Sequence, residues 1–196
     1  MSSKELRKVP EIRVFNKWST GGIEAQDPGL KRYISIRASL VPHTNGRHEH
    51  QRFRKSTINL AERLIDDMMR PGHSGGDKAK AIVIVQNALG IVAIRTGKNP
   101  LEILVKAVEN AAPCEDVTRI AYGGIVYPIS VDIAPQRRVD ISLRQITQAA
   151  RAASHNNPRT IDECLADELV LAAARDPKSA SVRKRDEIER VALASR

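Results

Sequence analysis

The sequence predicts a mostly α-helical fold, in which a domain of about six helices carries a protruding β-hairpin and a basic, extended N-terminal arm. Hydrophobic residues make up 41% of the 196 residues and are mainly Ala, Ile, Leu and Val, which favours aliphatic helix packing over a β-sandwich. From residue 56 onward, apolar residues recur mostly at helical spacing, with one interruption of period two. Before residue 56, helix breakers are frequent and cations outnumber acids.

Residues 1–55 are expected to form a largely irregular extension, and residues 56–196 the helical domain. The extension contains many breakers, among them Pro10, Gly21-Gly22, Pro28-Gly29, Pro42 and Asn45-Gly46. It holds 12 Lys and Arg against 5 Asp and Glu, whereas residues 56–196 hold 20 against 18. A nearly balanced body therefore carries a basic arm, whose shape we expect to depend on what it binds.

The first three helices of the body are delimited by breakers and caps. Apolar residues at helical spacing follow Ser56 and stop at Pro71-Gly72. A long helix then covers about 78–96. Asn99-Pro100 starts a third helix, because Asn is a good N-cap and Pro suits the first turn, and this helix ends before Pro113.

Residues 119–134 change from the helical period to a period of two, which predicts a β-hairpin. The alternating apolar residues stand next to Gly123-Gly124 and are Ile125, Tyr127, Ile129, Val131 and Ile133. Pro128 cannot donate a ladder hydrogen bond, so it favours an exposed ribbon over a central strand.

Three further helices complete the predicted body. The helical period returns over about 137–154. Thr160 with Glu163 forms a capping box for the next helix, about 161–175. A final helix over about 180–194 carries basic residues first and acidic residues after them.

Cysteine usage and hydropathy exclude several protein classes. Cys114 and Cys164 are far apart and have no second Cys nearby, so a disulfide framework or zinc cluster is not indicated. No stretch approaches the eighteen or so apolar residues of a membrane-spanning helix. The first residues, MSSKELRKVPEIRV, lack the apolar region of a secretory signal. We therefore expect a cytosolic protein with reduced thiols.

No constellation of residues indicates catalysis, a cofactor or a metal. The histidines at 43, 48 and 50 have no nearby Cys or defined fourth ligand. The glycine-rich segment 72–78 fails the spacing of a phosphate loop, so we interpret it as a helix–helix joint. Neighbouring acids on a helix point in different directions, so general acid–base pairs are not indicated by Asp66-Asp67, Glu115-Asp116 or Asp162-Glu163.

Basic clusters are the strongest functional signal. Each one alone could be a solvated charged face, but together with the surplus in the arm they favour a nucleic-acid partner. An anionic membrane is the weaker alternative, because the arm shows no amphipathic helical period. Charge alone does not choose between RNA and DNA. The clustered cations are Arg47, Arg52, Arg54 and Lys55; Lys78 and Lys80; Arg137 and Arg138; and Arg183, Lys184 and Arg185.

Several long segments, in order, resemble the ribosomal protein S-seven family. TGKNPLEILVKAVENAAPCEDVTRI (96–120) resembles the family signature, and YGGIVYPISVDIAPQRRVDISLRQI (122–146) its hairpin and Pro-x-Arg-Arg joint. The segment starting TIDEC at 160 is similar to the last two helices. Three shorter segments resemble the archaeal and eukaryotic branch of the family, namely FNKWST (15–20), VPHTNGRH (41–48) and RFRK (52–55). The resemblance covers nearly the whole chain.

The resemblance implies a structural constituent of the small ribosomal subunit, not an enzyme, without a cofactor. It implies binding to the 3′ major domain of small-subunit rRNA, organisation of the head, and a hairpin near the exit site beside mRNA and tRNA. A monomer within the cytoplasmic ribosome, with neighbouring ribosomal proteins and no membrane, is expected. The alternative is a free-standing RNA-binding or RNA-chaperone module.

The resemblance implies RNA contacts at the clustered cations above other than Arg47 and Lys80, and it adds Arg119. The hairpin residues implied to lie near mRNA and tRNA are Tyr122, Gly123, Gly124 and Tyr127. Two positions depart from the family, since Cys114 stands where Arg is frequent and Asp77 precedes Lys78 where a Gly-Lys-Lys pattern is common. Little positive charge lies between 120 and 136, so we expect the hairpin to act by shape and stacking rather than by charge.

Overall fold

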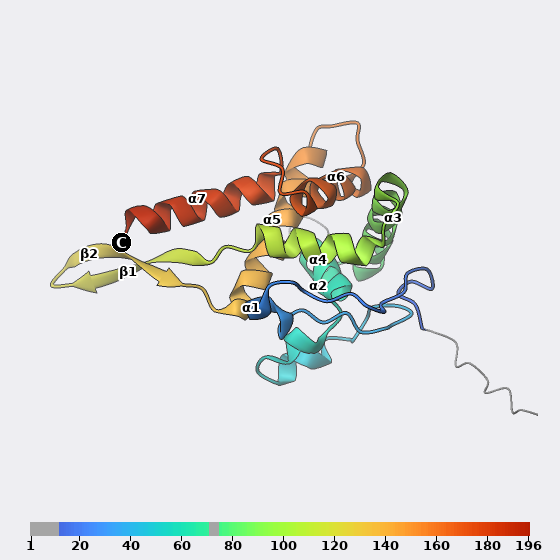
Figure 1. The fold of residues 1–196 in the computed structure, drawn as a ribbon, viewed down its shortest axis with the longest axis horizontal. Coiled ribbons are helices and arrows are strands. Elements are labelled where there is room, and N and C mark those ends of the chain that lie inside the picture. The colour runs from blue at the N-terminus through green and yellow to red at the C-terminus, as the bar shows by residue number, and fades with distance from the viewer. Residues whose placement is uncertain (1–11, 71–74) are drawn as a thin grey trace, which may run out of the picture.

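The computed structural model of the protein describes residues 12–70 and 75–196. Figure 1 shows a helical body from which a two-stranded hairpin and the last helix project side by side. The hairpin consists of β1 (Glu115–Tyr122) and β2 (Ile125–Asp132). The longer helices are α2 (Leu60–Met68), α3 (Lys78–Thr96), α4 (Pro100–Ala111), α5 (Pro135–Ser154), α6 (Ile161–Ala173) and α7 (Ala180–Ala194). The mostly helical fold with a protruding hairpin is therefore confirmed.

Helix ends follow the capping residues of the sequence. The Asn99 side chain accepts a hydrogen bond from Leu101 N (3.1 Å), and the Thr160 hydroxyl accepts one from Glu163 N (3.4 Å). Gly97 ends α3 with a φ of 64°, a left-handed conformation that glycine adopts without strain. These three predicted boundaries are confirmed because each rests on a local hydrogen bond or backbone conformation rather than on tertiary packing.

The first helix of the body starts later than predicted. Residues Arg54–Thr57 form a short 3-10 turn, η2, and α2 begins only at Leu60. The cause is Asn59, whose side chain accepts from Ala61 N at 2.9 Å and donates to Arg37 O at 2.6 Å. The helical spacing in the sequence begins at Ile58, so α2 starts two residues later than that spacing indicates. The following helix–helix joint lies partly outside the described residues, at 71–74.

The core forms around α6, which packs against α3, α4 and α5. Apolar side chains from each of these helices are completely buried, and each contributes roughly 1.5–3 kcal/mol relative to an exposed position. Examples are Leu89 in α3, Leu104 in α4, Ile146 in α5, and Leu165 and Leu169 in α6. The four helices therefore form a rigid body on which the surface residues are held.

Helix α3 corrects one expectation about membranes. It is 19 residues long and its mean hydropathy reaches 1.4, so by length and composition alone it could cross a membrane. The expectation that no stretch approaches this length is wrong. Its apolar residues include Val85, Leu89 and Val92, which are fully buried against the other helices. Core helices of soluble proteins pass the same test, so this property is weak evidence for a membrane.

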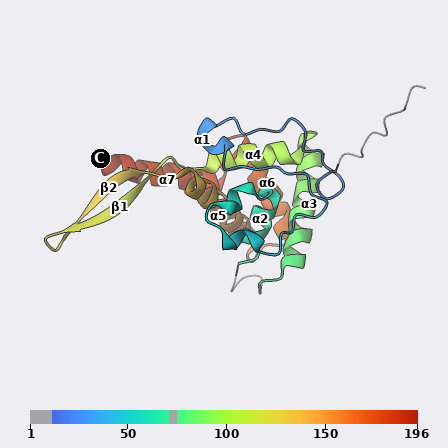
Figure 2. The same ribbon diagram turned by 90° about the horizontal axis from the view of Figure 1, so that it is seen from below.

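The described part of the arm, residues 12–55, lies against the body in Figures 1 and 2. Its elements are the short helix α1 (Pro28–Lys31) and the 3-10 turn η1 (Arg47–His50). Val14 and Leu30 are fully buried in the common core, and the rings of Phe15 and Trp18 meet edge to face at 5.9 Å. We expected the shape of the arm to depend on a partner. In the structure, its few apolar residues instead pack into the core of the chain itself.

The hairpin is longer at its base than predicted. Glu115 pairs with Asp132 and Tyr122 with Ile125, so the strands begin four residues before the expected start at 119. Gly123 and Gly124, with φ of 57° and 84°, form the two-residue turn that suits a twisted hairpin. Helix α7 runs along the hairpin, and Glu189 accepts a hydrogen bond from Cys114 N at 2.9 Å.

Candidate nucleic-acid interface

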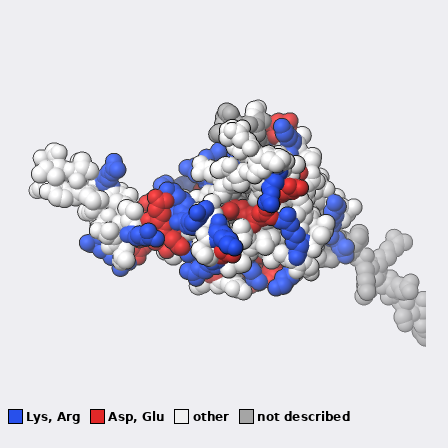
Figure 3. Space-filling view, turned by 90° about the horizontal axis from the view of Figure 1, so that it is seen from above, with Lys and Arg blue, Asp and Glu red and all other residues white. Residues whose placement is uncertain are grey.

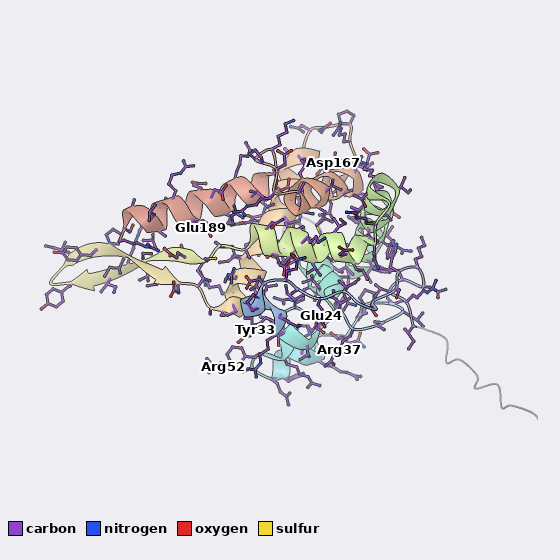
Figure 4. All side chains as sticks on the ribbon, viewed as in Figure 1. Glu24, Tyr33, Arg37, Arg52, Asp167 and Glu189 are labelled. Carbon is purple, nitrogen blue, oxygen red and sulfur yellow. The ribbon has the colours of Figure 1, made fainter. Side chains whose placement is uncertain are left out.

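The structure brings together two basic clusters that lie about eighty residues apart in sequence. Arg52 and Lys55 from the arm and Arg137 from the first turn of α5 line one groove of about 410 Å³. The other residues that line the groove are His48, Glu49, Gln51, Phe53, Ala134, Gln136 and Asp140. Figure 4 labels Arg52 on this side of the body, away from α7. A concave surface with three cations from two distant segments suits an anionic ligand.

Phe53 is the aromatic residue of this groove, and its backbone is unusual. Its φ is 64°, in the left-handed region that bulky residues rarely adopt, yet the residue is 55% exposed. The turn is held by Ser56, whose amide and hydroxyl both donate to Phe53 O, at 3.1 and 2.7 Å. The Arg52 guanidinium lies 5.0 Å from the ring centroid, within cation–π distance.

Beneath the groove, Asp140 of α5 connects the arm to the body. It accepts from Lys55 Nζ at 2.5 Å and from Arg63 Nη2 at 2.7 Å. Arg63 is buried and also donates to Tyr33 O at 3.0 Å. Lys55 keeps 40% of its side chain exposed, so it can face an anion while the pair with Asp140 fixes its position.

The neighbours Arg137 and Arg138 have different environments. Arg137 is exposed, and its side chain forms no hydrogen bond or ion pair with any described residue. Arg138 is 13% exposed, donates to Asp27 Oδ2 at 3.0 Å and to Pro113 O at 3.1 Å, and so joins α5 to α1 and to the base of the hairpin. Successive residues on a helix point in different directions, which separates the two roles.

Two other predicted cations are engaged inside the protein. Lys78, which is 18% exposed, lies 3.1 Å from both Glu62 and Asp66. Burial lowers the Lys78 pKa, but the hydrogen bonds to Asp66 and Glu62 outweigh burial and raise it. Arg185 is buried, donates to the carbonyl of Asn110 and pairs with Asp186.

Glu62, which Lys78 contacts, is itself buried and ties the arm to α2. It accepts hydrogen bonds from Thr44 N at 2.6 Å and from the Thr44 hydroxyl at 2.9 Å. Lys78, Arg138 and Arg185 therefore stabilise the fold, and any contact with an RNA would compete with these internal partners.

The remaining predicted cations are exposed but spread over several faces. Lys184 pairs with Glu187 at 2.7 Å on α7, where Arg183 is its neighbour. In Figure 3 blue and red side chains are mixed over the body, while the far end of the hairpin shows neither colour. Of the cations predicted to bind RNA, those that face solvent outside the groove are Arg47, Arg54, Lys80, Arg119, Arg183 and Lys184.

Sequence reasoning missed a second basic group at the other end of α5. Arg151 and His155 line two adjoining pockets of about 350 and 560 Å³. Lys80 lines the first pocket and Arg70 the second. The signal was present in the helical spacing, because Gln148, Arg151 and His155 recur at intervals of three and four on one face of α5.

Charges in this second group perturb one another. Burial and the neighbouring Arg70 lower the pKa of Arg151, whose guanidinium donates to Met68 O. Burial raises the pKa of Asp67 to about 6, Asp140 adds to this, and Arg70, whose Nη2 lies 3.8 Å from Asp67 Oδ1, opposes it. A carboxyl with a pKa of about 6 loses its negative charge as pH falls below 6, which leaves the group more cationic there.

The predicted hairpin site lies at the tip and has one apolar face. In this register Tyr122 and Tyr127 lie on the same face, and they are 81% and 49% exposed. Exposed apolar neighbours on that face are Ile120, Ile125, Ile129 and Val131. No charged residue occurs from 120 to 131, so this face presents aromatic rings and aliphatic side chains rather than charge.

The histidines and cysteines of the sequence have ordinary surroundings. His43 Nδ1 accepts from Asn45 N at 3.1 Å, and His48 lies 3.0 Å from Glu49. Across residues 12–70 and 75–196, no three His, Cys, Asp or Glu side chains gather as metal ligands do. Cys164 is buried, and the exposed Cys114 lies 3.4 Å from Arg138 Nη2.

Comparison with known proteins identifies the family. The family described as ribosomal protein S7p/S5e matches residues 30–196. The small ribosomal subunit protein uS7 of Methanothermobacter thermautotrophicus is 50% identical over 182 residues, 93% of this chain and 98% of that protein. The protein of the same name from Methanosphaera stadtmanae is 47% identical over 184 residues, 94% of this chain and 98% of that protein. The predicted resemblance is confirmed, and the chain belongs to the ribosomal protein S7p/S5e family.

Proposed function

We propose that this chain is a structural constituent of the small ribosomal subunit in the cytoplasm, where it binds rRNA and catalyses no reaction. Family membership supports the ribosomal role. The observation that carries the RNA-binding mechanism is the groove in which Arg52, Lys55 and Arg137 meet beside Phe53. Arginine offers a planar fork for phosphate, and an exposed ring offers a surface for a base.

The 3′ major domain of small-subunit rRNA is the proposed target, and organisation of the head is the proposed consequence. The resemblance to the family supports this choice, and the arrangement of α5 adds a physical reason. Arg137 stands near its first turn and Arg151 near its last. Fourteen residues of helix separate the two groups by about 21 Å along the axis. A rigid helix with a basic group at each end can hold two RNA segments at a fixed distance.

The hairpin is proposed to lie near the exit site, beside mRNA and tRNA, and to contact other ribosomal proteins or RNA through its apolar face. Tyr122 and Tyr127 support contact by stacking, because both rings are exposed on one face. The two-glycine turn at 123–124 keeps the tip narrow, so it can enter a confined space. The protein acts as a monomer within the ribosome in this proposal.

Binding of the full chain to a transcript of the 3′ domain tests the proposal. The control is an unrelated structured RNA of equal length, and both are titrated across a series of salt concentrations. We expect a preference of about a hundredfold or more that persists at high salt, since a shaped site retains contacts that are not purely ionic. Equal affinities that fall together with salt would instead support a free-standing RNA-binding or RNA-chaperone module.

A further inference from the structure

We propose that the groove at the start of α5 is a binding site for one unpaired nucleotide of an RNA, with its base stacked on Phe53 and its phosphate held by Arg137 and the start of α5. This inference rests on the proposed RNA-binding function and names the ligand of one site within it. The groove measures about 410 Å³, within the range of small-ligand pockets, and is too small for a duplex.

The base position follows from Phe53. A ring that is 55% exposed contributes little to the core, and the φ of 64° at this residue would suit Gly or Asn better than Phe. Folding therefore does not account for an aromatic side chain here. Strained residues of this kind gather at ligand sites. The Arg52 guanidinium lies over the ring, 5.0 Å from its centroid and within cation–π distance, and a base would stack on the ring beside it.

The phosphate position follows from α5. Its N-cap residue, Ala134, supplies no side-chain cap, and Ala134 and Gln136 both line the groove. The first turn of a helix has amides without intrahelical acceptors, here those of Gln136 and Arg137. The Arg137 side chain is also without an anionic partner among the described residues. Two amides, a positive helix end and a free guanidinium together match a phosphate.

The acids of the groove do not oppose this anion strongly. Asp140 is already paired with Lys55 and Arg63, at 2.5 and 2.7 Å. The Glu49 side chain is 77% exposed, so solvent screens its charge. The side-chain amide of Gln136 can donate and accept, so it is available to the edge of a base.

Two substitutions of Phe53 test the stacking, with the full chain and the 3′-domain transcript. Phe53→Leu keeps an apolar side chain of similar volume and loses the ring, so Kd should rise by about tenfold. Phe53→Tyr keeps the ring and should bind as the original protein does. Ile94→Ala is the matched control, because Ile94 is 86% exposed on α3, and it should not change Kd. Thermal unfolding of each variant without RNA verifies that it is folded.

The site itself is mapped by placing the photoreactive residue p-benzoylphenylalanine at position 53. Crosslinks should concentrate on one nucleotide that is unpaired in the free transcript. Removing the base of that nucleotide should weaken binding of the original protein by the same factor as Phe53→Leu, and should not weaken the Leu variant further. Crosslinks spread over helical nucleotides, or equal binding by the Leu variant, would overturn the nucleotide site. Loss of preference for the 3′-domain transcript by the unaltered protein would instead refute the proposed function.

Discussion

Neighbouring cations in this protein have separate tasks, and only the structure distinguishes them. Arg137 and Arg138 form one basic pair in the sequence, as do Lys78 and Lys80. In each pair one member is exposed and the other is held by carboxylates of distant segments, Asp27 for Arg138 and Glu62 for Lys78. Asp27 is 111 residues from Arg138, and Glu62 is 16 residues from Lys78, so no local sequence pattern predicts these pairs.

Substitution of each arginine in turn tests this division. Arg137→Ala should weaken RNA binding and leave the free energy of unfolding unchanged, because its side chain has no internal partner among the described residues. Arg138→Ala should lower the free energy of unfolding by about 1–3 kcal/mol, because Asp27 and the Pro113 carbonyl lose a charged donor. Urea unfolding without RNA measures the second effect. Equal losses of stability in both variants would contradict the assignment.

The raised pKa of Asp67, about 6, makes stability depend on pH at one residue. The native state holds this proton more tightly than the unfolded chain, whose value is near 3.8. The free energy of unfolding therefore falls as pH rises from about 4 to 6, by at most about 3 kcal/mol from this group.

Asp67→Asn removes this titration. At pH 7 the variant should be more stable than the original by on the order of 1 kcal/mol, and near pH 4 the two should be equal. Urea unfolding at several pH values measures the difference, in which contributions of all other groups cancel. A variant that is less stable at pH 7 would show that the charged form of Asp67 is favoured by Arg70 more than burial opposes it.

At the scale of elements, the sequence predicted those parts whose signals are local. The limits of α3, α4 and α6 agree closely with their caps at Gly97, Asn99 and Thr160. The base of the hairpin could not be predicted, because Glu115 and Asp116 break the alternation and β1 packs against α7, a distant segment. Arg196 pairs there with Glu115, and Glu189 with Cys114 N, contacts between segments 75 and 81 residues apart.

Shortening the hairpin tests whether it acts by shape. Replacing residues 120–127 by Gly-Gly keeps the Arg119–Pro128 pair and removes only uncharged residues. The slope of log K against log salt should not change, whereas alanine at Arg52, Arg54 and Lys55 together should reduce it by about two to three. The RNA titration described above supplies both slopes. A hairpin variant that changes the slope as much as the arm variant would refute contact by stacking.

At the scale of the whole molecule, the described part of the arm shares one hydrophobic core with the helices. Leu30 is completely buried in the core that α2 to α6 share, and Asp27 N donates to Glu109 of α4 at 2.9 Å. Composition suggested an extension because breakers and charges dominate it. The few apolar residues that decide its position were too sparse to form a period, so sequence alone could not place them.

Leu30→Ala tests this integration in the absence of RNA. Removal of a buried leucine side chain should lower the free energy of unfolding by about 2–5 kcal/mol. Leu40→Ala is the control from the same segment, because Leu40 is 56% exposed, and it should have little effect. An unchanged unfolding curve for the Leu30 variant would mean that the arm detaches without RNA. A packed arm costs less chain entropy on binding than one that must first order.

The pairing of Arg196 with Glu115 holds residue 196 beside the hairpin, where Figure 1 marks the end C. A reporter group tethered there would sample the surroundings of the hairpin without altering any of its residues. A tethered radical source at this position would cleave whichever RNA strands lie beside the hairpin in an assembled particle. Residue 196 is therefore a suitable attachment point for a probe that maps the RNA around the hairpin.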